Sequence, residues 1–394
     1  MHRCSPPSAA RAPSMGWLAL GVAALAGVLG LAGCSVLPES MGGTPPPPKP
    51  ANLAPNPNLL GVRQAWTGKI GAVGFPLDVR VVGQRVMVAA SDGTVTTIDT
   101  TTGAILWRAS AGAALAAGVG GDGDTAAVVT RDGDLIVLNR ERTLWRQRLA
   151  GQVHTAPLMA GGRVFVLAAD RTVSAFDASN GARLWTQQRP GEALVLRQAG
   201  VILPVGNTLV VGQGGRMAGF NPDNGTIRWE AALASSRGTN DVERLVDLVG
   251  RVSRVGDSVC ARAFQASVGC VDAQRGAVVW ARPAAGAEGL HGDERQIFGT
   301  ESDGRVVAWR RSDGERLWSV DALRFRGLTT PVLLGRSLAV GDAQGLVHLL
   351  SREDGSLLNR LTTDGTGIAA APVLAGNTLV VVTRSGGIFG FVPI

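Results

Sequence analysis

The sequence predicts an all-β fold, an eight-bladed β-propeller closed by its N-terminal strand, which completes the last blade. Three observations support this prediction. A tryptophan recurs along the chain, Asp-Gly and Asn-Gly pairs separate runs rich in Val, Ile and Leu, and each chain end holds only part of a repeat. A repeat of about forty residues with several short strands is typical of a propeller blade.

The recurring tryptophan measures the repeat. Consecutive members of the series lie 38 to 51 residues apart, and Leu358 takes the next place 40 residues after the last of them. The series consists of Trp66, Trp107, Trp145, Trp185, Trp229, Trp280 and Trp318. A large aromatic side chain near the end of each unit can anchor one sheet against the next. A β-sandwich does not require such regular punctuation, and the sequence shows no capping units of an open solenoid.

Residues 163–185 show the repeated unit clearly, and residues 85–107 and 296–318 repeat it. The unit is a strand, a tight turn, a second strand, an Asn-Gly or Asp-Gly turn, and a strand that ends in tryptophan. Gly, Asn and Asp tolerate the positive φ angles of short hairpin turns. The runs of Val, Ile, Leu and Phe suit strands that are buried on both faces.

The two ends of the repeat region predict a closed ring. Residues 64–66 read as the last strand of a unit with nothing before it, and residues 377–392 form a unit without its tryptophan strand. The N-terminal strand can therefore complete the final sheet, which removes the open edge between the first and last blades. We expect one propeller domain over residues 63–394.

The N-terminus reads as an export signal over residues 1–33. Basic residues such as Arg11 precede an uncharged stretch at 17–33 that ends in Leu-Ala-Gly before Cys34. The stretch is short for a membrane span, and no cluster of basic residues follows it. Leu-Ala-Gly-Cys resembles a lipobox, which implies lipidation of Cys34 and a membrane anchor. Ser35 after it resembles the sorting signal for the outer membrane.

Residues 34–62 are rich in proline, with a run of four at 45–48. Proline-rich segments are stiff and extended. We therefore expect a lipidated tether that holds the propeller away from the membrane.

Several function classes find no support in the sequence. Arginines are scattered and the only lysines are Lys49 and Lys69, so no basic run marks a nucleic-acid surface. His154, His291 and His348 fall in different units, and no pattern of paired histidines or cysteines predicts a metal site. No serine stands in a nucleophile elbow. We predict no catalytic residues, no metal and no cofactor.

Cys260 and Cys270 align with Phe165 and Ala175 of the unit at 163–185, in two strands joined by a hairpin turn. They can lie opposite each other, and an exported protein meets an oxidising compartment. We predict a cross-strand disulfide; the alternative is two small buried thiols.

The repeat resembles those of quinoprotein dehydrogenases, whose eight-bladed propellers hold pyrroloquinoline quinone and Ca²⁺. That resemblance implies an enzyme as the alternative function. The chain departs from the family in two respects. It has no adjacent pair of cysteines, and it lacks the long insertions that cover the cofactor in those enzymes.

The lipobox, the proline-rich tether and the bare repeat together resemble the BamB family of bacterial outer-membrane lipoproteins, from Cys34 to the C-terminus. Leu194-Val-Leu196-Arg197 resembles the Leu-x-Leu-Arg segment with which this family binds BamA, a membrane β-barrel with periplasmic domains. Residues 243–247, which end in Asp247, resemble the family's Arg-Leu-x-Asp stretch on the same surface. The family often has a second acid two residues later, where this chain has valine. The alternative is that the two leucines belong to an innermost strand.

The resemblance implies a non-catalytic scaffold of the β-barrel assembly machinery. We expect it to be anchored in the outer membrane, to face the periplasm, to bind a periplasmic domain of a BamA-like protein and to have no nucleic-acid partner. Unfolded outer-membrane proteins could pair with the propeller rim as clients. The alternative is a dehydrogenase dependent on pyrroloquinoline quinone and Ca²⁺ on the same propeller.

Overall fold

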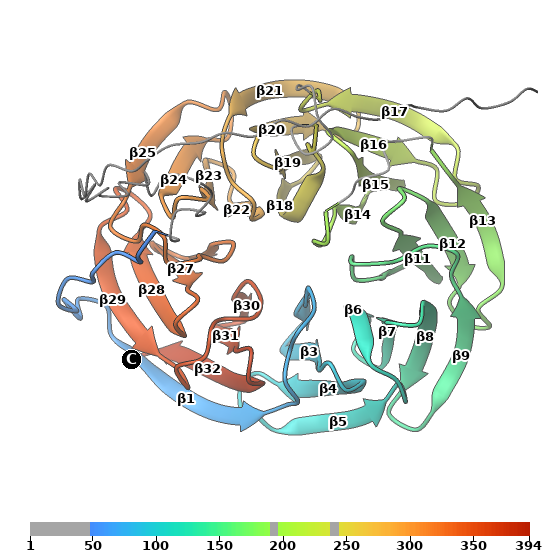
Figure 1. The fold of residues 1–394 in the computed structure, drawn as a ribbon, viewed down its shortest axis with the longest axis horizontal. Helices are drawn as coiled ribbons and strands as arrows, with labels where there is room; N and C mark the ends of the chain where they lie inside the picture. The colour runs from blue at the N-terminus through green and yellow to red at the C-terminus, as the bar shows by residue number, and fades with distance from the viewer. Residues whose placement is uncertain (1–47, 190–195, 237–243) are drawn as a thin grey trace, which may run out of the picture. The chain divides into compact units, whose positions relative to one another are not determined.

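Eight four-stranded antiparallel sheets stand around a ring in the computed structural model (Figure 1), which describes residues 48–189, 196–236 and 244–394. Within these residues all regular secondary structure is β-strand. The predicted eight-bladed propeller is therefore confirmed. In each of blades 1 to 7 the chain runs outward from the ring centre, and the connection to the next blade returns to the centre.

The bounds of the strands follow the tryptophan repeat. Blades 1 to 4 comprise β2 (Arg80–Val82), β3 (Arg85–Ala89), β4 (Thr94–Asp99), β5 (Ile105–Ser110); β6 (Leu115–Gly121), β7 (Thr125–Thr130), β8 (Asp134–Asn139), β9 (Thr143–Arg148); β10 (Leu158–Ala160), β11 (Arg163–Leu167), β12 (Val173–Asp177), β13 (Arg183–Gln187); β14 (Ile202–Val205), β15 (Thr208–Gln213), β16 (Arg216–Phe220) and β17 (Ile227–Ala232). Blades 5 to 7 comprise β18 (Leu248–Val255), β19 (Ser258–Ala263), β20 (Ser267–Asp272), β21 (Ala277–Pro283); β22 (Leu290–Gly292), β23 (Gln296–Thr300), β24 (Val306–Arg310), β25 (Arg316–Val320); β26 (Val332–Leu334), β27 (Ser337–Gly341), β28 (Leu346–Ser351) and β29 (Leu357–Thr362).

Blade 8 joins the two ends of the chain. It comprises β30 (Val373–Ala375), β31 (Thr378–Val382), β32 (Gly387–Pro393) and, as its outermost strand, β1 (Val62–Lys69). β1 pairs with β32 antiparallel from Val62↔Pro393 to Lys69↔Gly387. The predicted closure by the N-terminal strand is confirmed, and it leaves no unpaired sheet edge where the ring closes.

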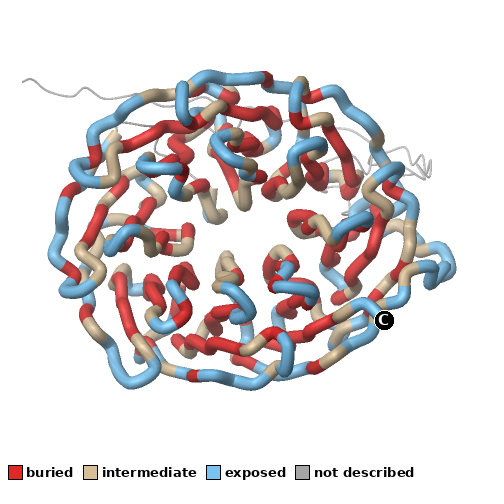
Figure 2. Tube along the Cα trace, turned by 180° about the vertical axis from the view of Figure 1, so that it is seen from behind, coloured by how far each residue is buried: buried red, intermediate tan, exposed pale blue. Residues whose placement is uncertain are grey.

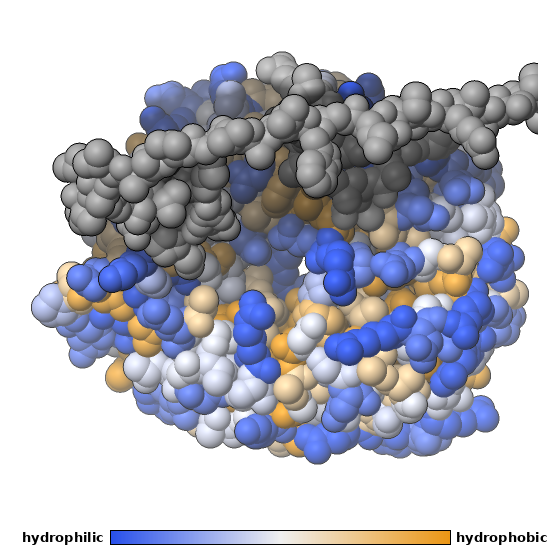
Figure 3. Space-filling view, viewed as in Figure 1, coloured by the Kyte–Doolittle hydropathy of each residue, from blue (hydrophilic) through white to orange (hydrophobic). Residues whose placement is uncertain are grey.

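The core lies between neighbouring blades, not inside any one of them. The second and third strands of a blade are buried almost throughout, as in β7 and β8, because each of their faces meets another sheet. The outermost strands are mostly exposed, and Figure 2 shows this change from buried to exposed along each blade. Figure 3 shows hydrophilic residues over much of one face, with smaller hydrophobic groups between them.

The tryptophans join each blade to the next. In six blade pairs the ring lies against a glycine in the turn between the third and fourth strands of the following blade, the pairs being Trp66–Gly103, Trp145–Gly181, Trp185–Gly225, Trp229–Gly276, Trp280–Gly314 and Trp318–Gly355. Where the indole N–H of these residues has a hydrogen bond, as in Trp280 to the carbonyl of Arg311 at 2.7 Å, the acceptor is a backbone oxygen of that blade. Each ring thus buries apolar surface and satisfies its polar group in one contact.

In blade 7 the place of the tryptophan is taken by Asn359, whereas the spacing predicted Leu358: buried Asn359 pairs with Leu349 across β28 and β29 as Trp318 pairs with Ala308 in blade 6. The loss of the tryptophan has a structural reason. The following blade contains both chain ends, so its third and fourth strands, β32 and β1, are not joined by a turn. No turn glycine is present there to receive an indole ring. The backbone of Leu358 instead accepts a hydrogen bond of 2.7 Å from Leu59 N, in the segment that leads into β1.

Residues 48–61 differ from the expectation of a tether that stays clear of the propeller. Leu53 packs against the apolar cluster between blades 6 and 7, and Leu60 packs against the cluster between blades 7 and 8. Asn56 Nδ2 donates a hydrogen bond to Asn359 Oδ1 at 2.9 Å. Proline makes this segment extended, as its composition predicts, but extended backbone also lies easily along a blade edge. Residues 1–47, with the predicted signal peptide and Cys34, lie outside the described residues.

The tryptophan contact predicts that Gly314→Ala destabilises the propeller more than an equivalent change elsewhere. Gly314 has φ +73°, and a Cβ there would lie 2.3 Å from the Trp280 ring. Positive φ costs alanine about 1–2 kcal/mol, and overpacking adds about 1–3 kcal/mol. Gly335→Ala is the matched control, because Gly335 has φ +56° but open space around its Cβ position. Urea unfolding followed by tryptophan fluorescence measures both; equal losses of stability would contradict the packing account.

Candidate partner-binding site

The loops that hold the predicted binding residues share one face of the ring. We call it the connector face: it carries the links between blades, such as residues 150–157, and the hairpins between second and third strands, such as residues 168–172. Leu196 and Arg197 lie on this face in the link before β14, and Asp247 lies there directly before β18. Leu196 and Arg197 precede the innermost strand of blade 4 and are not part of it. Leu194 lies outside the described residues.

The structure brings Leu196 and Asp247 to one small pocket between blades 3, 4 and 5. The pocket has a volume of about 50 Å³, and His154 and Leu167 of blade 3 also line it. Leu196 is half-buried and Arg197 is exposed beside it. Two loops that are far apart in sequence therefore form one continuous surface, which we call the rim site.

Asp247 is held in place by a residue that the sequence analysis did not find. Arg171 Nη2 lies 3.3 Å from Asp247 Oδ1, and both side chains are largely buried. Arg171 itself has φ +67°, and its carbonyl accepts a 3.0 Å hydrogen bond from Gln213 Nε2. Among the described residues, Asp247 Oδ2 has no hydrogen-bond partner. One carboxylate oxygen is thus fixed by Arg171, and the other is buried beside the pocket.

Backbone hydrogen bonds fix the loops of the rim site across blades. Gly200 N donates to Thr155 Oγ1 at 2.9 Å, Leu248 N donates to Gly214 O at 2.9 Å, and Gly250 N donates to Ala199 O at 2.8 Å. Burial, and secondly the positive charge of Arg197, lower the pKa of His154, so its imidazole is neutral at pH 7. The site is a preformed, partly apolar surface with one exposed cation and one fixed carboxylate. Val249, at the position where the resemblance implies a second acid, is buried in β18.

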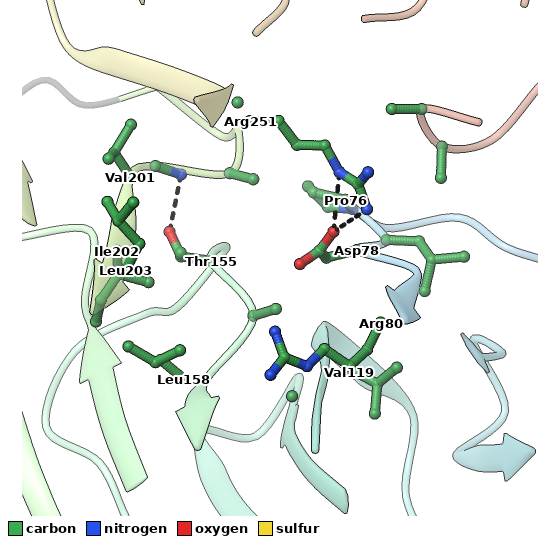
Figure 4. Close-up of a pocket in the computed structure, with 18 of the residues that line it drawn as sticks. Pro76, Asp78, Arg80, Val119, Thr155, Leu158, Val201, Ile202, Leu203 and Arg251 are labelled. Carbon is green, nitrogen blue, oxygen red and sulfur yellow. Dashed lines mark hydrogen bonds and ion pairs between the residues drawn. The ribbon is translucent and has the colours of Figure 1, made fainter. Parts of the chain in front are cut away.

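The central channel is the place to test the quinone alternative. It holds a cavity of about 420 Å³ lined by the innermost strands (Figure 4). Arg251 of blade 5 crosses the ring to Asp78, which precedes β2, at 2.8 Å, and donates to Val79 O at 2.9 Å. These two charges neutralise each other, whereas Arg80, which also lines the cavity, donates to the carbonyl of Gly121 at 3.0 Å.

The other acidic group of the channel does not favour a hard cation either. Burial raises the pKa of Glu288, although nearby Arg262 acts in the opposite direction. Ca²⁺ prefers several charged or carbonyl oxygens, and a raised pKa makes this carboxyl a weaker ligand for it. Within the described residues, no group of three or more His, Cys, Asp or Glu side chains is placed to hold a metal ion. The channel residues do not fit a quinone with Ca²⁺, and we derive no reaction step through them.

Cys260 and Cys270 lie opposite each other in β19 and β20, as their alignment with Phe165 and Ala175 suggests. Their sulfur atoms are 1.94 Å apart, as a disulfide, and both residues are buried in the apolar cluster between blades 5 and 6. Arg311 Nη1 lies 3.1 Å from Cys260 Sγ. This pair is remote from the rim site, so we treat its bond as structural.

Comparisons with known proteins agree with this architecture. A sequence profile described as "Outer membrane protein assembly factor BamB" matches residues 91–320 and 315–392. The chain is 37% identical over 376 residues to the outer membrane protein assembly factor BamB of Burkholderia pseudomallei, covering 94% of this chain and 97% of that protein. It also resembles the crystal structure of BamB from Moraxella catarrhalis, with TM-score 0.76, 24% identity and coverage of 84% and 99%.

The fold is also shared with enzymes. The quinohemoprotein alcohol dehydrogenase from Comamonas testosteroni aligns with TM-score 0.66 and 16% identity, covering 85% of this chain and 77% of that one. At this identity the likeness shows the fold alone.

Fold and repeat define the chain as an eight-bladed β-propeller built from PQQ-like repeats. Its similarity over nearly the whole length places it further: the chain belongs to the family of the outer membrane protein assembly factor BamB. Among the described residues, no helix has the length and apolar character needed to cross a membrane.

We expect the buried His291 of the channel to make the protein less stable in acid. Burial, followed by Arg251 and Arg311, lowers the pKa of His291 from 6.5 to about 4. Because the folded-state pKa is below the unfolded one, the stabilisation is complete above pH 6.5 and is lost as pH falls toward 4. The loss is on the order of 3 kcal/mol. Urea unfolding at pH 7 and pH 4 should show a smaller drop for His291→Asn than for the parent; identical drops would contradict this.

The cysteine pair predicts a protein without free thiols. If Cys34 is acylated and Cys260 is bonded to Cys270, a thiol count on unreduced, denatured mature protein should give none. Reduction should lower the free energy of unfolding by about 2–3 kcal/mol, because the bond closes a loop of sequence separation 10. Two free sulfhydryls before reduction would show that Cys260 and Cys270 are not joined by a disulfide.

Proposed function

We propose that this protein is a non-catalytic scaffold of the β-barrel assembly machinery, which binds a periplasmic domain of a BamA-like protein through the rim site. Membership of the BamB family supports a role in outer-membrane protein assembly. The observation that carries the site is the convergence of Leu196 and Asp247 on one pocket. They lie in the links before blades 4 and 5, and the stacking of neighbouring blades brings these links together.

The rim site has the chemistry of a binding hot spot. Half-buried Leu196 offers apolar contact next to a pocket, and exposed Arg197 offers a planar guanidinium for a carboxylate or backbone oxygen. Arg171 keeps the carboxylate of Asp247 in position beside that pocket, where both side chains are largely buried. Because the loops are fixed before binding, the partner loses little affinity to the ordering of this surface.

The proposal includes a lipid anchor at Cys34 in the outer membrane, with the propeller on the periplasmic side. The lipobox and proline-rich stretch support it. The outermost strands, which expose residues such as Leu106 and Val279, could also pair with unfolded outer-membrane proteins. The quinone-dependent dehydrogenase is the weaker candidate, because Asp78 is already paired with Arg251 and, within the described residues, no group of three or more His, Cys, Asp or Glu side chains is placed to hold Ca²⁺.

Arg197→Ala is expected to abolish co-purification of the BamA-like protein from detergent-solubilised membranes while the propeller remains folded. The reason is that Arg197 is exposed at the rim site, so its loss removes a charge-assisted contact without leaving a buried cavity. Arg336→Ala is the matched control: Arg336 is also exposed, but it lies on the hairpin between β26 and β27, on the opposite face of the ring. Full recovery of the partner with Arg197→Ala would refute the site.

A further inference from the structure

Residues 48–61, which we call the strap, run along blade 7 before entering blade 8 as β1. We propose that the strap transfers tension from the N-terminal anchor into blade 7 and so protects the seam between β1 and β32. The inference rests on the proposed anchoring at Cys34. It assigns a mechanical role to a segment whose composition suggests only a spacer.

The seam is the weak point of a propeller tethered at its N-terminus. β1 is an outermost strand and has one neighbour in its sheet, β32. The first pair of the ladder, Val62↔Pro393, lies at the end where the tether enters. A pull on Val62 would open the hydrogen bonds of this ladder one after another, which requires less force than breaking them together.

Before it reaches the seam, the strap is bonded to blade 7 at successive points. Near its start, Ala51 N donates to Arg324 O at 2.8 Å and Ala51 O accepts from Arg326 Nη1 at 3.0 Å. Further along, Arg360 Nη2 donates to Ala54 O at 3.1 Å, and Asn56 binds Asn359. Tension that arrives from residue 47 therefore meets these bonds first.

Arg326, which donates to the carbonyl of Ala51, is itself fixed by a buried cluster of charged residues. Arg326 is 5% exposed, and its Nε donates to Asp342 Oδ2 at 2.8 Å. The same carboxylate oxygen lies 3.0 Å from Nε2 of the fully buried His348, and Asp342 Oδ1 accepts backbone N–H bonds from Gln344 and Leu346. Arg326 also binds the side chain of Gln344. A cluster tied into the β27–β28 hairpin in this way gives the strap a rigid attachment.

At its other end the strap takes the place of the missing tryptophan contact. Leu59 N donates to Leu358 O, and Asn359 Nδ2 donates to Leu60 O at 2.6 Å. Blade 7 thus grips the chain immediately before β1 begins at Val62. The blade pair without a tryptophan is the pair that the strap joins.

Single-molecule pulling tests the strap directly. One handle is attached to the Cys34 thiol of a periplasmic form left unacylated, and the other to Glu141→Cys, an exposed position on blade 2. We expect a high force for the first rupture. Asn56→Ala and, separately, Arg326→Met should each lower the force of this event, because each removes one of the successive attachments of the strap. Asn52→Ala, another exposed strap asparagine, is the matched control and should keep it.

A second attachment point separates a mechanical role from a merely structural one. With the N-terminal handle moved past the strap to Arg63→Cys in β1, the first rupture should occur at low force and should not respond to Asn56→Ala. Equal forces from Cys34 and Arg63→Cys, or variants that lower both alike, would overturn the proposal. Because Asn56 is exposed, its variant tests the strap even if Arg326→Met fails to fold. Palmitate labelling of Cys34 tests the anchor independently of either result.

Discussion

The packing of one tryptophan ring onto the next blade's turn is the contact on which the ring depends. A blade of four strands buries little by itself, since its inner strands need a neighbouring sheet on each face. The ring of Trp280, for example, lies against Gly314 of the next blade, and its N–H donates a hydrogen bond to that blade's backbone. Repetition of this contact sets the angle between blades, and that angle decides how many blades close the ring.

The rim site is a product of this geometry. Its loops come from blades 3, 4 and 5, so their distances depend on how those blades stack. Backbone bonds such as Leu248 N to Gly214 O then fix the loops against one another. The same stacking pinches the channel, where Arg251 reaches Asp78 from the opposite side of the ring. One packing rule thus produces the rim site, which we propose as a partner surface, and the ion pair of Arg251 with Asp78 across the channel.

The sequence predicts what repetition encodes and misses what occurs once. The blade count, the role of β1 and the register of Cys260 opposite Cys270 follow from aligning units with one another. The ion pair of Arg171 with Asp247 joins residues that are 76 positions apart in different blades, so no local pattern reveals it. Prolines predict extended backbone and say nothing about what that backbone touches, so the sequence predicts a free tether where residues 48–61 lie against blade 7.

The entry point of the strap has a consequence for orientation. Ala51 is bonded to Arg324 and Arg326 in the link before β26, which belongs to the connector face. The rim site opens on that same face, toward blades 3 to 5. With the proposed anchor at Cys34, tension from the bilayer therefore draws toward the membrane the face that carries the proposed rim site. A protein seated in that bilayer can be met without the propeller having to turn over.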